Sequence, residues 1–204
     1  MSIIKEKYKT ISSPTTSLFK DRGSKFLGYS YPIRSTEDVK NLLAEIKKEH
    51  PKATHHCFAY RLGTEGLVFR ASDDGEPSGS AGRPILGQID SLGFTNVLVI
   101  VVRYYGGTML GVPGLINAYK TATLDALQIA LPTEKWITQR VEITMDYNAM
   151  SEVLYLLKQC EAQIIKQDLQ LFCTVVADIP NVHYEQYSAQ LLKIRGLNLS
   201  TISS

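Results

Sequence analysis

The clearest hydrophobic pattern in the chain lies between residues 97 and 129. Six apolar residues, Val97 to Val102, follow one another without a break, and most of them are β-branched. A short unbroken run of this kind is typical of a strand that is buried on both faces. After a glycine-rich turn, apolar residues recur at helical spacing, and this stripe consists of Leu115, Ala118, Tyr119, Ala122, Ala126 and Ile129. The pattern therefore predicts a strand, a glycine-rich turn and a helix in direct succession.

The residues before this unit predict a strand, an amphipathic helix, a hairpin and a short helix. Pro32 would end the strand near a sheet edge, and Pro51 would stop the first helix. Ser80 is the expected N-cap of the short helix, because a serine hydroxyl can accept hydrogen bonds from the first turn. In order, these elements cover residues 25–31, 36–50, 54–62 paired with 67–72, and the stretch from the Ser80 cap to about residue 93.

Beyond Leu131-Pro132-Thr133 the chain shows a second regular pattern. Its elements follow the order β-α-β-β-α-β, which is the ferredoxin-like split motif. Asn148 and Asn181 are the expected N-caps of its two helices, and Asp168 the expected turn of its hairpin. The strands are expected at residues 136–145, 163–167, 170–177 and 197–202. We therefore predict an α+β protein with two domains, residues 1–131 and residues 135–204.

The composition is that of an ordinary globular protein, with 21% charged and 44% hydrophobic residues. No apolar run approaches the roughly 20 residues that a bilayer-spanning helix needs, and the first ten residues lack the apolar core of a signal peptide. Cys57, Cys160 and Cys173 are scattered and odd in number, as expected for reduced thiols. We therefore expect a cytoplasmic protein without membrane contact.

Charge is distributed unevenly along the chain. The net charge of +2 is too small to predict a nucleic-acid-binding protein by itself. Residues 1–131, however, carry 16 lysines and arginines against 12 aspartates and glutamates, whereas residues 132–204 carry 6 against 8. The excess in the first part can serve solubility alone or an anionic partner, and the sequence leaves both open.

The glycine-rich turn at residues 106–111, Gly-Gly-Thr-Met-Leu-Gly, precedes the predicted helix. Free backbone N–H groups at a helix start favour an anion, as does the helix dipole. The turn matches neither the Walker phosphate loop nor the G-x-G-x-x-G fingerprint. Arg103, Tyr104 and Tyr105 would stand at its rim, at the strand end where ligands of open parallel sheets bind. The alternative is a tight turn that packs the helix against the strand.

A second glycine-rich stretch places Asp73, Asp74 and Glu76 within four residues. Three carboxylates can hold Mg²⁺ together with water. They equally suit an acidic turn whose carboxylates cap backbone N–H groups or pair with Arg83 or Arg103. Arg103 therefore has two interpretations, a phosphate contact or an internal ion pair. We expect no bound cofactor, with Mg²⁺ as the one alternative.

The sequence His55-His56-Cys57 suggests a metal site only at first sight. On a strand, His55 and Cys57 share one side, whereas His56 shares the other with Phe58 and Tyr60. Two ligands are too few for zinc, and no CxxC or HxxxH pair completes the set. His56 is better interpreted as part of a packed or base-stacking face.

Nucleophilic catalysis has little support. Ser78 and Ser80 lie on a glycine-rich turn, and His55 or His56 could act as the base. The chain has no G-x-S-x-G motif and no identifiable third member of a triad. No residue is therefore assigned a catalytic role.

Residues 73–84, DDGEPSGSAGRP, and residues 103–111, RYYGGTMLG, resemble the IMPACT family in its bacterial YigZ-like branch, and residues 52–61 resemble the histidine strand of that family. The resemblance implies an N-terminal α/β domain of the ribosomal-protein and elongation-factor type. It also implies a ferredoxin-like C-terminal domain similar to the last domain of the ribosomal translocase. Eukaryotic members regulate translation by competing for a partner in the starvation-sensing kinase pathway, whereas the bacterial members have no secure biochemical role.

From the residues and the resemblance together, we expect a non-enzymatic, cytosolic, translation-associated regulator that binds RNA or a ribosome-associated partner. The alternatives are a protein-interaction module without nucleic acid and an enzyme that acts on a phosphorylated small molecule. Asp73, Asp74 and Glu76 are expected to bind a metal or to cap the loop. The expected nucleic-acid or anion-binding residues are Ser78, Gly79, Arg83, Arg103, Tyr104, Gly106, Gly107, Thr108 and His56.

Overall fold

The computed structural model describes residues 6–169 and 172–202. The chain divides into two compact units, of which the first is Tyr8–Lys135 and the second joins the chain from Trp136 onward to the segment before Tyr8. Helices and strands occur in both units, so the protein is of the mixed α/β class. Within the described ranges, no helix is long and apolar enough to cross a membrane.

The first unit is built on a five-stranded sheet with the strand order β2-β3-β6-β4-β5. Each pair of neighbouring strands in this sheet is antiparallel. The predicted hairpin around Gly63 and Gly66 is confirmed as the β4–β5 pair. The strands are β2 (Thr15–Asp21), β3 (Ser24–Pro32), β4 (His55–Leu62), β5 (Val68–Ser72) and β6 (Val97–Tyr104).

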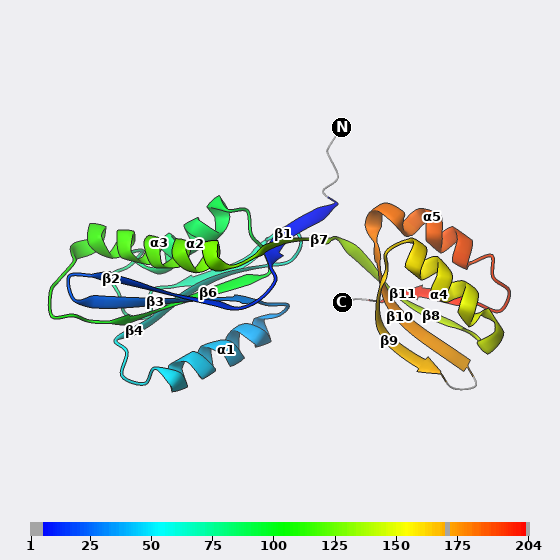
Figure 1. Ribbon diagram of the computed structural model, residues 1–204, viewed down its shortest axis with the longest axis horizontal. Helices are drawn as coiled ribbons and strands as arrows, with labels where there is room; N and C mark the ends of the chain where they lie inside the picture. Colours follow the sequence, from blue (N-terminus) through cyan, green and yellow to red (C-terminus); the bar gives the residue numbers. More distant parts are fainter. Residues whose placement is uncertain (1–5, 170–171, 203–204) are drawn as a thin grey trace. The chain divides into compact units, whose positions relative to one another are not determined.

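Helices cover both faces of this sheet, with α2 and α3 on one face and α1 on the other (Figure 1). Strand β6 is central, so its apolar run is buried on both sides, as predicted from the unbroken pattern. Val97, Val99 and Val101 pack towards α2 and α3, whereas the residues between them pack towards α1. The helices are α1 (Thr36–Glu49), α2 (Gly82–Ser91) and α3 (Gly111–Ile129).

Two expectations about this unit were wrong. Ile129, at the end of α3, is 57% exposed and does not belong to the buried stripe, because the helix ends there and Leu127 fills the core instead. Pro32 does not mark a sheet edge, since β3 lies between β2 and β6. The proline is tolerated because it is the last residue of its strand.

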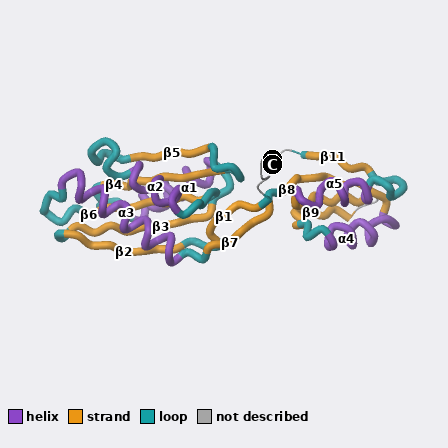
Figure 2. The backbone as a smooth tube through the Cα atoms, turned by 90° about the horizontal axis from the view of Figure 1, so that it is seen from above, coloured by secondary structure: helices purple, strands orange, loops and turns teal. Residues whose placement is uncertain are grey.

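The segment expected to separate the domains is itself a strand. Strand β7 (Pro132–Trp136) pairs with β1 (Lys7–Ile11) in a separate two-stranded sheet (Figure 2). Ser12 N–H also donates a hydrogen bond to the carbonyl of Leu131, at 3.1 Å. Strand β7 is held by backbone pairing with β1. It therefore needs no alternation of apolar and polar residues, and the sequence shows no sign of it.

The second unit has the element order predicted for it, β-α-β-β-α-β. Its sheet has the strand order β11-β8-β10-β9, and α4 and α5 pack on one face around Val141, Ile143 and Val175. The elements are β8 (Thr138–Asp146), the 3₁₀ turn η1 (Tyr147–Ala149), α4 (Met150–Gln159), β9 (Gln163–Leu169), β10 (Phe172–Pro180), α5 (Asn181–Leu191) and β11 (Asn198–Thr201).

Three local details of this unit differ from expectation. Asn148 lies within the 3₁₀ turn that precedes α4 and does not cap that helix. Asn181 is the first residue of α5, so its side chain is one position too late to act as the N-cap. Asp168 lies in β9 opposite Thr174 and not in the hairpin turn. Part of the strand expected at residues 170–177 lies outside the described residues, which exclude 170 and 171.

Candidate functional site

Both glycine-rich stretches predicted as site elements lie at the same end of the five-stranded sheet. One follows β5 and the other follows β6. The antiparallel register brings these ends together, because β4 pairs Phe58 with Ser72 and His55 with Arg103. Strand β6 is antiparallel to both of its neighbours, so the expected ligand site at the end of an open parallel sheet is wrong for this fold.

The first stretch is organised by the carboxylate of Asp73. Its Oδ1 accepts hydrogen bonds from the N–H groups of Ala81 and Gly82, at 3.0 and 2.8 Å, and its Oδ2 accepts one from Gly79, at 2.8 Å. Burial raises the pKa of Asp73, but these bonds and the nearby charge of Arg83 outweigh it, so the pKa is lowered overall. Asp73 therefore satisfies the N-terminus of α2 in the manner of a cap.

Ser80 does not have the predicted capping role. Its hydroxyl donates to the carbonyl of Pro77, at 2.6 Å, and thereby closes the loop on itself. The residue at the N-cap position is Ala81, which has no side-chain acceptor. Asp73 takes the place of Ser80 as the acceptor, because the loop folds back and brings its carboxylate to Ala81, eight residues later in the sequence.

The other two carboxylates of the stretch face different partners. Asp74 Oδ2 accepts a hydrogen bond from the N–H of His56, at 2.7 Å, while its Oδ1 lies 3.8 Å from Lys47 Nζ. Glu76 is turned inward and is 8% exposed. The three side chains thus do not converge on one point. No group of three or more His, Cys, Asp or Glu side chains that could hold a metal occurs in residues 6–169 and 172–202.

Glu76 is the centre of a buried polar cluster beneath the loops. Its Oε1 accepts hydrogen bonds from Arg103 Nη1 and from the hydroxyl of Tyr119, both at 2.7 Å. His55 Nε2 lies 3.9 Å from the same oxygen, while His55 Nδ1 lies 2.8 Å from the carbonyl of Asp74. The carboxylate is thereby compensated by one full positive charge and one hydroxyl, as a buried charge requires.

Cys57 and Tyr119 complete this cluster without being activated. Cys57 Sγ lies 3.3 Å from the Tyr119 hydroxyl and 2.9 Å from the carbonyl of Asp73. Burial, more than any neighbouring charge, raises the pKa of the Cys57 thiol and of the Tyr119 phenol. Both side chains are therefore neutral near pH 7, and a thiol in that state is a poor nucleophile.

Arg103 is not at the rim, where the sequence placed it. It is 6% exposed, and its guanidinium carbon lies 5.5 Å from the ring centroid of Phe26 and 5.6 Å from that of Tyr105. Its Nη1 is paired with Glu76, which is the internal ion pair that the sequence left as one of two interpretations. Its Nε has no hydrogen-bond partner among the described residues.

The turn after β6 forms the exposed rim of the site. Gly106 N–H donates to Ser24 Oγ, at 3.1 Å, and a Cβ at Gly106 would overlap the backbone of Gly23 and Ser24. Gly107 has φ +85° and open space around it, so the turn needs glycine there for its backbone conformation. Thr108 is exposed beside it.

The remaining predicted residues separate into two groups. Ser78 and Arg83 are exposed near the start of α2, but the N–H of Gly79 is already donated to Asp73. His56 and Tyr104 lie on the opposite face of the sheet, the one covered by α1. His56 Nε2 is 3.2 Å from the carbonyl of His50, and burial lowers the pKa of His56. His56 and Tyr104 therefore lie on the opposite face of the sheet from α2 and α3.

Several cations that the sequence argument missed gather at the same end of the sheet. Arg22 lies beside Gly23, which adjoins Gly106, and Lys25 is opposite Tyr104 in the β3–β6 register. Lys52 precedes Thr54, whose N–H donates to the carbonyl of Arg103 at 2.8 Å. With Arg83, this gives four exposed cations, and none of them is in an ion pair with another residue of the described part of the chain. We call Arg22, Lys25, Lys52 and Arg83 the basic rim.

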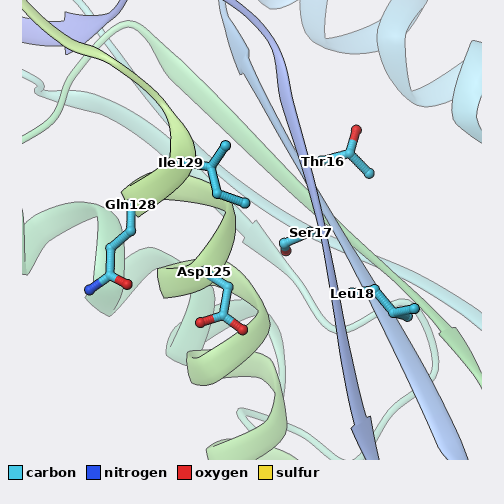
Figure 3. A pocket seen from close by; sticks show the side chains of 6 residues that line it. All are labelled: Thr16, Ser17, Leu18, Asp125, Gln128 and Ile129. Carbon is cyan, nitrogen blue, oxygen red and sulfur yellow. The ribbon is translucent and has the colours of Figure 1, made fainter.

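A surface hollow between β2 and α3 has a different character. It is lined by the six side chains that Figure 3 labels, of which Asp125 is the one charged group. Ser17 is already committed, since its hydroxyl donates to the carbonyl of Ala122 at 2.9 Å. A hollow whose charge is negative is not suited to a phosphate, so we do not assign it to the candidate site.

The profile of the Impact N-terminal domain matches residues 22–127, which contain the two loops, the buried cluster and the basic rim. The chain belongs to the IMPACT family, as its motifs predicted. The match covers β3 to β6 of the five-stranded sheet, the helices α1 and α2, and α3 as far as Leu127.

Individual relatives extend the likeness beyond that domain. The IMPACT family member YigZ of Escherichia coli (strain K12) is 32% identical over 182 residues, which are 88% of this chain and 89% of that protein. Protein IMPACT of Oryctolagus cuniculus is 38% identical over 96 residues, or 45% of this chain and 30% of that protein. A solved structure described as that of a hypothetical protein has a TM-score of 0.75 at 30% identity and covers 98% of this chain and 100% of its own.

Proposed function

We propose that the protein is a non-enzymatic, translation-associated factor of the cytoplasm that binds RNA through the basic rim. The observation that carries this proposal is the grouping of four exposed, unpaired cations at one end of the first unit. The start of α3 lies at the same end, and its dipole adds positive potential there, whereas the N-terminus of α2 is already compensated by the carboxylate of Asp73. An anionic, extended partner is the ligand that such a surface favours.

The distribution of charge supports the first unit as the binding unit. Residues 132–204 carry two more acidic than basic side chains. In that unit, Arg140 is already held by both oxygens of Asp178, at 2.7 and 2.8 Å. A paired arginine offers less to a phosphate than Arg22, Lys25 and Lys52 of the basic rim do.

The family supports a role near translation. The resemblance described above implies that eukaryotic IMPACT proteins regulate translation. Protein IMPACT of Oryctolagus cuniculus matches this chain over a segment of 96 residues. We propose that the first unit is an α/β domain of the ribosomal-protein and elongation-factor type. The strand order of the second unit supports a ferredoxin-like domain. Both fold types recur in proteins that act on the ribosome.

An enzyme is less well supported by the geometry. The buried thiol and phenol are neutral, and the buried carboxylate is held by Arg103 and Tyr119. A catalytic nucleophile or base needs a perturbation that makes it reactive near pH 7. The cluster therefore supports a structural role for these groups beneath a binding surface.

The experiment measures the binding of a fluorescent single-stranded RNA by anisotropy over a range of salt concentrations. If phosphates contact the basic rim, the logarithm of the binding constant falls linearly with the logarithm of salt, and each contact contributes a slope of about 0.7. We expect Lys25→Ala and Arg83→Ala each to remove about one contact from the slope. Lys193→Ala, an exposed lysine of the second unit, is the matched control and should leave the slope unchanged.

Two outcomes would contradict the proposal. An affinity that does not depend on salt would exclude phosphate contacts. Tight binding of a ribosome-associated protein, unaffected by nuclease treatment and by the two rim variants, would favour a protein-interaction module instead.

A further inference from the structure

A hollow of about 500 Å³ opens beside the basic rim, on the face of the sheet that α1 covers only in part. It shares Gly23, Lys25 and Tyr105 with the rim and its turn. Its volume is within the range of about 300–1,000 Å³ that small-molecule sites have. Its lining residues are Leu18, Gly23, Lys25, Leu27, His50, Tyr104 and Tyr105.

One wall of the hollow is apolar and another is aromatic. Leu18 and Leu27 are directly opposite each other in the β2–β3 register, and Leu18 is 53% exposed. Tyr105 is 49% exposed, and one face of its ring lies over the guanidinium of Arg103. Because Glu76 holds Arg103 in place, the tyrosine ring has a fixed support on that face and can present the other to a flat ligand.

His50 joins two tyrosine hydroxyls at the edge of the hollow. Its Nε2 lies 2.6 Å from the hydroxyl of Tyr29, and its Nδ1 lies 2.9 Å from the hydroxyl of Tyr104. Both ring nitrogens are thus engaged, so the ring holds the two hydroxyls in fixed positions. Burial raises the pKa of Tyr29 to about 12, so this hydroxyl keeps its proton.

Tyr29 is 7% exposed, so the His50 ring is anchored on its Nε2 side by a buried residue. Tyr104 lines the hollow and is held by the other ring nitrogen, Nδ1. A tyrosine hydroxyl can donate one hydrogen bond and accept others, so that of Tyr104 is available to a ligand in the hollow.

We propose that this hollow binds one unpaired nucleobase of single-stranded RNA. The base stacks on the free face of Tyr105, its edge forms a hydrogen bond with the hydroxyl of Tyr104, and an adjoining phosphate faces Lys25. A base inside a duplex is stacked and paired, so the hollow selects single strands. The inference rests on the proposed RNA binding and adds to it the part of the ligand that is recognised.

The test compares two probes of equal length, a 12-nucleotide oligouridylate and an abasic ribose-phosphate oligomer. The phosphates are the same in both probes, so their difference reports on the bases alone. We expect the intact protein to bind the oligouridylate about tenfold more tightly, because stacking of one base on an aromatic side chain has an effect of that size. Tyr105→Leu should abolish this preference without weakening the binding of the abasic oligomer, whereas Tyr105→Phe should retain it.

The control is Tyr155→Leu, since Tyr155 is 61% exposed in the second unit and should not affect the preference. Melting temperatures verify that each variant is folded. Equal affinity of the intact protein for both probes, or a preference that survives Tyr105→Leu, would overturn the base site while leaving RNA binding intact. If neither probe binds, the proposed function fails, and this inference fails with it.

Discussion

Arg103 Nη1 lies 2.7 Å from Glu76 Oε1, with the two side chains only 7% and 2% exposed. The pair joins the end of β6 to the first glycine-rich loop, 27 residues earlier in the chain. Arg103 also supports the ring of Tyr105, so an interaction below the surface helps to position a residue of the proposed base site. Stability and ligand binding are therefore linked through one buried arginine.

Removal of Arg103 should destabilise the protein strongly. Arg103→Ala leaves the Glu76 carboxylate buried without its cation, and we expect the free energy of unfolding to fall by about 3–5 kcal/mol. Urea denaturation measures the loss. Lys40→Ala is the control, because Lys40 pairs with Glu37 on the surface, where both side chains are more than half exposed, and should cost less than about 0.5 kcal/mol.

The double variant Arg103→Met with Glu76→Leu extends this test. Replacing both partners of a buried pair by apolar groups removes the unpaired charge, but it leaves the Tyr119 hydroxyl without its acceptor, so we expect only part of the lost stability to return. If the single variant Arg103→Ala is as stable as the parent protein, Arg103 does not compensate Glu76, and a direct ligand contact becomes the better interpretation.

Asp73→Ala should remove the cap of α2 and lower the free energy of unfolding by about 1–2 kcal/mol. The folded-state pKa of Asp73 is lowered, so the stabilisation is complete above the unfolded pKa, near about pH 4, and is lost as the pH falls through the folded value. The stability of Asp73→Ala should therefore fall less on acidification than that of the parent protein. Thermal melts from about pH 6 down to about pH 2 provide the measurement.

Glu65→Ala, an exposed acidic residue of the β4–β5 turn, is the control for this prediction. It should keep the stability and the acid dependence of the parent protein. The same melts with added Mg²⁺ test the metal hypothesis. A rise in melting temperature with Mg²⁺ that disappears in Asp73→Ala and Asp74→Ala would contradict the capping role and support a metal site.

Gly106 and Gly107, the two adjacent glycines of the turn after β6, should respond differently to substitution by alanine. A Cβ at Gly106 would overlap the backbone of Gly23 and Ser24, so Gly106→Ala must displace one of the two loops. Gly107 has open space, and Gly107→Ala should cost only the strain of a positive φ, about 1–2 kcal/mol. Equal melting temperatures for the two variants would show that the close approach of Gly106 to Gly23 is not required.

Residues 136–204 should fold when expressed alone, because they have their own apolar core. The fragment should be somewhat less stable than the same residues in the intact chain. It lacks Lys7, whose Nζ lies 3.9 Å from the ring centroid of Trp136, and the carbonyl of Glu6 that accepts from Ile137 N–H at 2.8 Å. Calorimetry of the fragment decides this, and the absence of a cooperative transition would show that the boundary is wrong.

The elements with strong local signals could be predicted from the sequence. Val97 to Val102 form an unbroken β-branched run, and the hairpin turn at Gly63 to Gly66 separates two β-prone segments. In both cases the information lies within a few residues. The β-α-β-β-α-β order was predictable for the same reason, since each of its elements has its own periodicity.

The candidate site was less predictable, because its contacts join residues that are distant in sequence. Whether Ser80 or Asp73 caps α2 depends on how a nine-residue loop folds back, and both residues are good acceptors. The partner of Arg103 depends on an antiparallel register that the apolar run of β6 does not reveal. Tyr119 is the one missed residue with a usable signal, since a tyrosine on a buried stripe needs a partner for its hydroxyl.

The close approach of Gly23 to Gly106 joins the β2–β3 turn to the turn after β6. Two turns that touch through bare backbone, with Gly106 N–H donating to Ser24 Oγ, cannot move independently by more than a small amount. Amide hydrogen exchange in the β2–β3 turn and in the turn after β6 should therefore occur in one cooperative opening event. A ligand bound to either turn would slow amide exchange in both, so the two turns would respond to binding as one rigid unit.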